Sequence, residues 1–193
     1  MKIPTLCLLT LVSCLTAHSV FAEARTIGTI EAVLDGKPKT WTLIYSDDDA
    51  SHSALWVPHG AGQNMAILGG YESLDITFGK DESGHPTVSG PGSMLTINFG
   101  FAVGAKSAKH TLPQQGAAAV GVMYLPRVGD YSSMLGMEEG VVEVTTIDMS
   151  ARGEAKFTGT FSGKLQSMDA ARTTVTITDG RFEVEKARQM QSR

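Results

Sequence analysis

The chain has 193 residues, 42% of them hydrophobic, and a formal net charge of −4. Acidic and basic residues are interspersed along it, and a phosphate-binding surface needs a basic patch, so nucleic acid is not expected as a partner. Cys7 and Cys14 are the two cysteines and both lie near the N-terminus, so the rest of the chain has no disulfide and must be stabilised by packing.

Residues 1–22 predict an export signal, because a lysine is followed by an apolar run and a small-residue exit. Val20 and Ala22 occupy the two small-residue positions of a cleavage site, which would release a periplasmic or secreted chain that begins at Glu23. Alternatively, Leu11 to Cys14 resembles the lipobox of bacterial lipoproteins, in which Cys14 is lipidated and anchors the protein to a membrane. No later stretch approaches the ~20 apolar residues of a spanning helix, so a membrane is expected only through that anchor.

Residues 26–34 and 39–45 predict two strands, and Asp35-Gly36 between them is typical of a tight hairpin. Trp41 and Tyr45 share one face of the second strand. Together with Trp56, these aromatic residues predict either a surface for a ligand or partner, or a buried sheet face.

Asp47, Asp49 and Ser51 match the first alternating positions of a calcium loop. The match then fails, because His52 stands where the loop needs glycine and a proline stands where it needs glutamate, so an irregular site or a plain acidic turn remains. His52 and His59 could supply imidazoles for a transition metal, or could be exposed loop residues. These five residues are the metal candidates, but no metal or other cofactor is expected.

Large apolar residues fall on every second position of residues 94–101, which predicts a strand with one buried face formed by Leu95, Ile97, Phe99 and Phe101. Residues 102–118 predict a long loop. Asp179-Gly180 predicts a second tight hairpin, and residues 186–193 predict a frayed tail or one helical turn. The recurring strand patterns and 21 glycines predict an all-β domain over residues 23–185, either an antiparallel β-sandwich or a closed or partly open β-barrel.

The C-terminal region carries a resemblance to a known group. The segment Gly-Thr-Phe-Ser-Gly at 159–163 is followed by Val-Thr-Ile-Thr-Asp-Gly-Arg-Phe at 175–182, within a wider similarity over residues 131–185. This region resembles the end of small exported bacterial β-sandwich proteins, many of them lipoproteins, that have no assigned activity. Residues 28–41 are similar to the way such proteins open, with a strand, an Asp-Gly-type turn and a tryptophan. The resemblance implies a fold and no catalytic residues.

The sequence contains no G-x-S-x-G, H-E-x-x-H or P-loop motif, and no cysteine after residue 14. We therefore expect an exported, non-catalytic envelope protein that binds a protein or an envelope component through loops or a sheet edge. Two alternatives remain open. One is a carrier of an apolar ligand in a barrel cavity, and the other is a hydrolase whose site is assembled from dispersed residues.

Overall fold

The structure is a computed structural model that describes residues 25–45, 52–113, 120–167, 169 and 172–190. Its elements in chain order are β1 (Arg25–Leu34), β2 (Lys37–Tyr45), β3 (Ala54–Pro58), β4 (Gln63–Tyr71), β5 (Thr77–Lys80), β6 (Pro86–Ser89), β7 (Met94–Ala102), β8 (Ala108–Leu112), β9 (Gly121–Leu125), the 3-10 turn η2 (Tyr131–Ser133), β10 (Leu135–Met149), β11 (Glu154–Ser167) and β12 (Thr174–Gln189). In these ranges no helix has the length and apolar character needed to cross a membrane. The predicted all-β class is confirmed.

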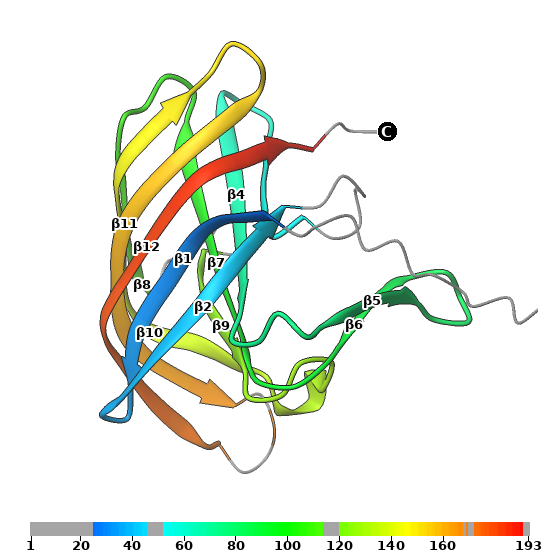
Figure 1. Cartoon of the computed structure of the whole chain (residues 1–193). Helices are drawn as coiled ribbons and strands as arrows, with labels where there is room; N and C mark the ends of the chain where they lie inside the picture. Colours follow the sequence, from blue (N-terminus) through cyan, green and yellow to red (C-terminus); the bar gives the residue numbers. More distant parts are fainter. Residues whose placement is uncertain (1–24, 46–51, 114–119, 168, 170–171, 191–193) are drawn as a thin grey trace, which may run out of the picture.

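Ten of the strands form one sheet that curves round on itself (Figure 1). Antiparallel pairs run from β1 through β2, β4, β7, β9, β10, β11 and β12 back to β1. Within the described residues, β2 and β4 are joined by a single pair, Thr42 with Tyr71. β3 pairs with β4 and also lies parallel to β12, where Leu55 faces Arg188. The pairing is therefore that of a partly open barrel, the alternative predicted beside a sandwich, with one parallel contact.

Inward-facing side chains of the barrel form the main core. The predicted buried face of β7 is confirmed, since Leu95, Ile97 and Phe99 are fully buried and Phe101 is 3% exposed. The Phe99 ring lies 5.2 Å from the ring of Phe157 and 5.9 Å from that of Phe182. Burying an aromatic ring of this size contributes about 1.5–3 kcal/mol, so aromatic packing across the interior stabilises the barrel.

Two Asp-Gly pairs have different structural roles. Asp35-Gly36 turns between β1 and β2 with φ values of 45° and 79°, which confirms the first predicted hairpin. The second prediction is wrong, because Asp179-Gly180 lies inside β12. The register shifts there against both neighbouring strands, so β12 carries a bulge, and Asp179 has a φ of 53°. A bulge needs the same tolerance of positive φ as a tight turn, so the residue pair fits both.

Two other segments predicted to be irregular belong to the sheet. The predicted loop of residues 102–118 contains β8, which pairs with residues 140–144 of β10. The predicted tail begins inside β12, which continues to Gln189 because Ala187 is fully buried and pairs with Ala155 of β11. Small alanine side chains gave this strand end no strong apolar pattern.

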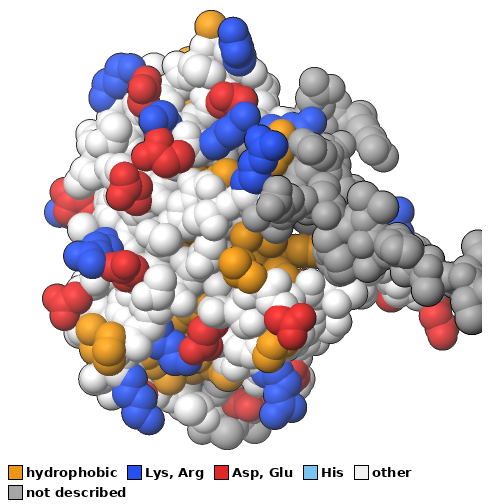
Figure 2. Space-filling view, in the orientation of Figure 1, with side chains coloured by type: hydrophobic (Ala, Val, Ile, Leu, Met, Phe, Trp, Pro, Cys, Tyr) orange, Lys and Arg blue, Asp and Glu red, His pale blue; other side chains and the backbone are white. Residues whose placement is uncertain are grey.

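An arm formed by β5 and β6 projects from the side of the barrel (Figure 1). Its root packs against the outside of the barrel in a second apolar cluster, which consists of Ile44, Tyr71, Ile76, Val88 and Val128, with Phe78 and Met94 beside them. Hydrophobic side chains are visible in a hollow on the side of the body from which the arm extends (Figure 2). Apolar packing thus anchors the arm near the place where a single residue pair joins β2 to β4.

Candidate functional site

The structure brings three of the residues singled out from the sequence to one end of the barrel. Tyr45 ends β2, His52 precedes β3, and their rings lie 4.7 Å apart with a tilt of 51°. Trp56 of β3 is only 7% exposed, and its Nε1 donates a hydrogen bond to the carbonyl oxygen of Gly153 at 3.0 Å. Tyr45 and His52 thus contact each other, and Tyr45 and Trp56 both lie beside Gly153 in the turn that connects β10 and β11.

A cleft of about 320 Å³ lies at this end of the barrel, and we call it the rim cleft. It is built from the end of β2, the β10–β11 turn and the end of β12, and its lining residues are Tyr45, Arg152, Gly153, Glu154, Lys186, Arg188 and Gln189. In the upper part of Figure 2, at the end of the body that carries the β10–β11 turn in Figure 1, Lys and Arg side chains lie among Asp and Glu side chains. The described lining of the rim cleft is therefore polar, with three cationic side chains and one carboxylate.

Local backbone geometry holds the turn in place. The hydroxyl of Ser150 accepts hydrogen bonds from the backbone N–H groups of Arg152 and Glu154, at 3.3 and 3.2 Å. Gly153 has a φ of 77°, a conformation that favours glycine, and a Cβ there would lie 3.0 Å from Oε1 of Gln189. The turn thus packs closely on the end of β12, which brings Arg152 to the same cleft as Lys186.

Lys186 is held by two partners. Its Nζ donates to Oε1 of Glu154 at 2.8 Å and lies 5.1 Å from the ring centre of Tyr45, as in a cation–π contact. The hydrogen bond to Glu154, together with the charges of Glu154 and Tyr45, raises the pKa of Lys186 against the opposing effects of desolvation and Arg25. Lys186 therefore remains a cation at neutral pH.

The other cations of the rim cleft are guanidinium groups. Nη1 of Arg188 donates a hydrogen bond to Nε2 of His52 at 2.7 Å. Arg152 is exposed at the rim. Among the described residues that line the cleft, Arg152, Lys186 and Arg188 are cations and Glu154 is a carboxylate.

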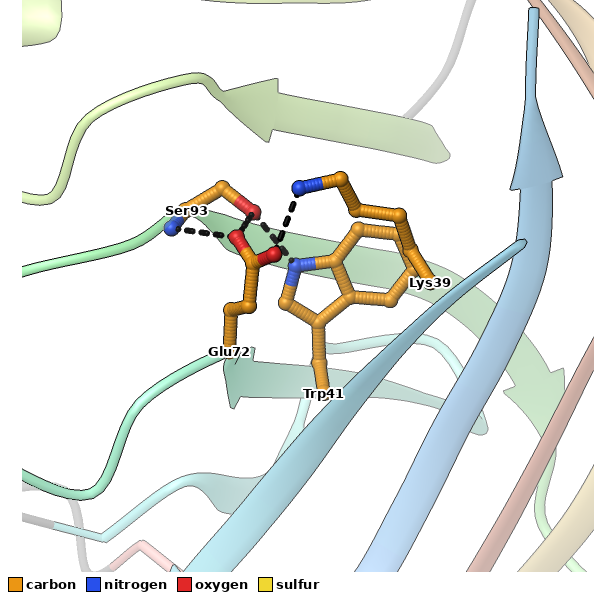
Figure 3. A network of polar contacts seen from close by, with 4 residues as sticks. All are labelled: Lys39, Trp41, Glu72 and Ser93. Carbon is orange, nitrogen blue, oxygen red and sulfur yellow. Dashed lines mark hydrogen bonds and ion pairs between the residues drawn. The ribbon is translucent and has the colours of Figure 1, made fainter. Parts of the chain in front are cut away.

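Trp41 lies elsewhere, in the core (Figure 3). Its side chain is fully buried, and Nε1 donates to Oγ of Ser93 at 3.0 Å. Ser93 in turn donates through its backbone N–H and its hydroxyl to the carboxylate of Glu72, which also receives Nζ of Lys39 at 2.5 Å. Glu72 precedes the arm and Ser93 follows it, so this network connects the two segments that flank the arm to β2. Trp41 has this structural role and presents no surface to a ligand.

The remaining predicted residues do not form a described site. Asp47, Asp49, Ser51 and Cys14 lie outside the described residues. His59 is exposed at the turn after β3, where its backbone N–H donates to the carbonyl of Gln63, and His52 contacts Tyr45 and Arg188. Among the residues that the structure describes, no group of three or more His, Cys, Asp or Glu side chains could hold a metal ion.

The sequence analysis missed Arg152, Lys186 and Arg188 as site residues. Tyr45 and Arg188 are far apart in the chain, and the pairings of β1 with β2 and with β12 bring them to the same end of the barrel. The one available signal was the pair Lys186 and Arg188, but that pair stood in the segment predicted as a tail.

Comparison of the chain with family models, with curated proteins and with solved structures finds no match. The resemblance of residues 131–185 to small exported β-sandwich proteins stays a prediction. The interpretation of the rim cleft therefore depends on its own geometry and charge.

Proposed function

We propose that this chain is an exported, non-catalytic protein of the cell envelope that binds an envelope component in the rim cleft. The observation that carries the proposal is the convergence of Tyr45, Arg152, Lys186 and Arg188 from three parts of the chain on one concave surface. Ligands commonly bind at the mouths of β-barrels, where loops and strand ends can present polar groups from a rigid scaffold. Export is inferred from residues 1–22.

Packing in the interior supports binding at the rim in preference to an apolar ligand inside the barrel. The rings of Phe99, Phe101 and Phe157 contact one another with centre-to-centre distances of 5.2–6.1 Å, and Phe182 stacks on Phe99. Aromatic side chains therefore occupy space that a carried ligand would need.

The buried hydroxyl of Ser93 has no role that supports a hydrolase. Ser93 is 1% exposed, its Oγ donates to Glu72 at 2.6 Å, and it accepts a hydrogen bond from Trp41. A nucleophile must reach a substrate carbonyl and needs an adjacent base to activate it. Here the hydroxyl is enclosed, and its partners connect the arm to the barrel. Binding at the rim cleft thus explains more of the observed geometry than a dispersed hydrolytic site.

Native mass spectrometry of the protein recovered from its own cell envelope tests the proposal. We expect a chain that carries a bound component, and the same spectrum reports whether the chain begins at Glu23 or is acylated at Cys14. The component should be reduced or lost in Arg188→Gln and retained in the control Arg181→Gln. Arg181 is an exposed residue on the outer face of β12, where it pairs with Glu31, so the control makes the same charge change outside the cleft. A bare wild-type chain, or equal retention in both variants, would contradict the proposal.

A further inference from the structure

We infer that a second copy of this chain docks on the outer face of β3, β4, β7 and β9, with a two-fold axis near Asn98. We call this face the uncharged wall. It does not line the rim cleft, so the inference goes beyond the proposed function. Because their neighbours along each strand belong to the main core, the side chains that point outward from these strands include Leu55, Val57, Met65, Ile67, Asn98 and Met123.

The composition of the uncharged wall sets it apart from the rest of the barrel surface. β3, β4, β7 and β9 contain no Asp, Glu, Lys or Arg. A sheet face that meets water normally carries polar residues, and the outer face of β11 and β12 does so, with Lys156 and Glu185 in an ion pair. On the uncharged wall most outward side chains are aliphatic or methionine, as is typical of a surface that a partner covers.

Strand register places Asn98 at the centre of the wall. β4 and β7 have 9 residues each, pair along their whole length (Figure 1) and have Ile67 and Asn98 as their middle pair. Leu55 of β3 lies opposite Ile67. Within the described chain, the arm packs at one end of these strands through Tyr71 and Met94, and the sheet has no second layer of strands over the rest. An axis at Asn98 would bring the centres of two walls together.

The amide of Asn98 indicates the chemistry of the partner. The side chain is 8% exposed, and its Oδ1 is buried without a hydrogen-bond partner in the part of the chain that the structure describes. A buried acceptor without a donor destabilises a fold. An asparagine carries both an acceptor and donors, and an isologous interface brings a residue near the axis to its own copy, so Nδ2 of each Asn98 can donate to Oδ1 of the other. An acyl chain has no donor, so a lipid surface would leave Oδ1 unpaired.

Charge and size also fit a second copy. Two uncharged walls meet without like-charge repulsion, and the flexible side chains of Met65 and Met123 can adapt to the opposing surface. At about 4.8 Å between strands and about 3.3 Å per residue, the four strands present about 450 Å². Two such faces bury about 900 Å², which is below the ~1,200 Å² of a stable complex. We therefore expect a reversible dimer that forms as the concentration rises.

Sedimentation velocity of the full exported chain over a series of concentrations tests this inference. We expect a dimer in the wild type, and dimer formation that weakens about tenfold or more in Ile67→Lys, because the interface would bury an unpaired ammonium group. Leu74→Lys makes the same kind of change at an exposed residue between β4 and β5, outside the wall, and should dimerise like the wild type. Thermal unfolding of each variant confirms that it is folded. A wild type that is monomeric at every concentration, or equal dimer formation by Ile67→Lys, would overturn the inference.

A cysteine substitution tests the position of the axis. No cysteine follows residue 14, so Asn98→Cys gives a chain that begins at Glu23 a single thiol. In an isologous dimer the two thiols would meet, and copper phenanthroline as the oxidant should link them in a disulfide. Leu74→Cys should stay largely unlinked under the same conditions. A dimer in which both variants link equally, or neither links, would overturn the placement of the axis at Asn98.

Vesicles test a lipid surface as the alternative occupant of the wall. The expected result is a chain that dimerises in solution and does not sediment with phospholipid vesicles. A monomeric chain that sediments with the vesicles, and loses this binding in Ile67→Lys, would assign the wall to a lipid surface and overturn the inference.

Discussion

Replacing Gly159 with alanine tests the packing of the barrel wall directly. Gly159 lies in β11, opposite Val144 of β10, and its own backbone has an ordinary φ for a strand. A Cβ at this position would lie 2.3 Å from the backbone carbonyl oxygen of Glu143 and 2.5 Å from Cζ of Phe182. Real Cβ atoms essentially never approach other atoms this closely, so either the backbone of β10 or the buried ring of Phe182 must shift.

The magnitude follows from what has to move. The carbonyl of Glu143 belongs to the backbone of β10, and Phe182 is 3% exposed among other aromatic rings, so neither partner yields easily. Overpacking of this kind costs about 1–3 kcal/mol. For a chain of this size, each kcal/mol shifts Tm by about 2–4 °C, so Gly159→Ala should lower Tm by about 2–12 °C.

A second glycine provides a matched control. Gly136 lies in β10, also without a positive φ, and a Cβ there would have no atom within 4 Å. Gly136→Ala should therefore leave stability unchanged or raise it by up to about 1 kcal/mol, because alanine restricts the unfolded chain. Thermal and urea unfolding, followed by circular dichroism, measure both variants. If Gly159→Ala were as stable as the wild type, the close contact of Gly159 with Phe182 and β10 would be refuted.

Three further predictions concern the core and the network at the base of the arm. Phe157→Ala removes a fully buried ring and should lower the free energy of unfolding by about 3–5 kcal/mol in urea, and a loss below 1 kcal/mol would contradict the filled interior. Trp41→Phe removes the hydrogen-bond donor to Ser93 and should lower the free energy of unfolding by about 1 kcal/mol. An unchanged unfolding midpoint would show that this hydrogen bond does not stabilise the fold. Partial burial raises the pKa of Glu72, but hydrogen bonds from Lys39 and Ser93 outweigh this effect and lower the pKa below its ordinary value of 4.5. The contribution of Glu72 to stability is therefore present above pH 4.5 and is lost as the pH falls through the lowered pKa. In urea unfolding at a series of pH values, the stability of the wild type should therefore fall more steeply below pH 4.5 than that of Glu72→Gln. An equal fall in stability for both proteins would contradict this prediction.

The strand pattern predicted the core where large side chains alternate, and failed where small ones do. Leu95 to Phe101 marked a buried face because each inward residue is large. The end of β12 has Ala187 at its inward position, so pairing with Ala155 defines the strand there without a strong sequence signal. Asp179-Gly180 was misplaced because a bulge and a tight turn require the same backbone conformation.

The candidate site could be predicted only in part. Tyr45 and Trp56 stood out by their aromatic character and His52 as a metal candidate, and all three lie around the rim cleft. Arg188 reaches His52 because β3 lies parallel to the end of β12, a long-range pairing that local periodicity does not encode. Arg152 depends on a turn whose contact with β12 is likewise set by tertiary structure.

Amide chemical-shift mapping tests most directly the central claim, that the rim cleft is the binding site. The isotope-labelled exported chain would be titrated with a solubilised extract of its own cell envelope. The account predicts shifts concentrated at Tyr45, at residues 152–154 and at residues 186–189. An unchanged spectrum, or shifts centred on Arg181 and the outer face of β11 and β12, would contradict it.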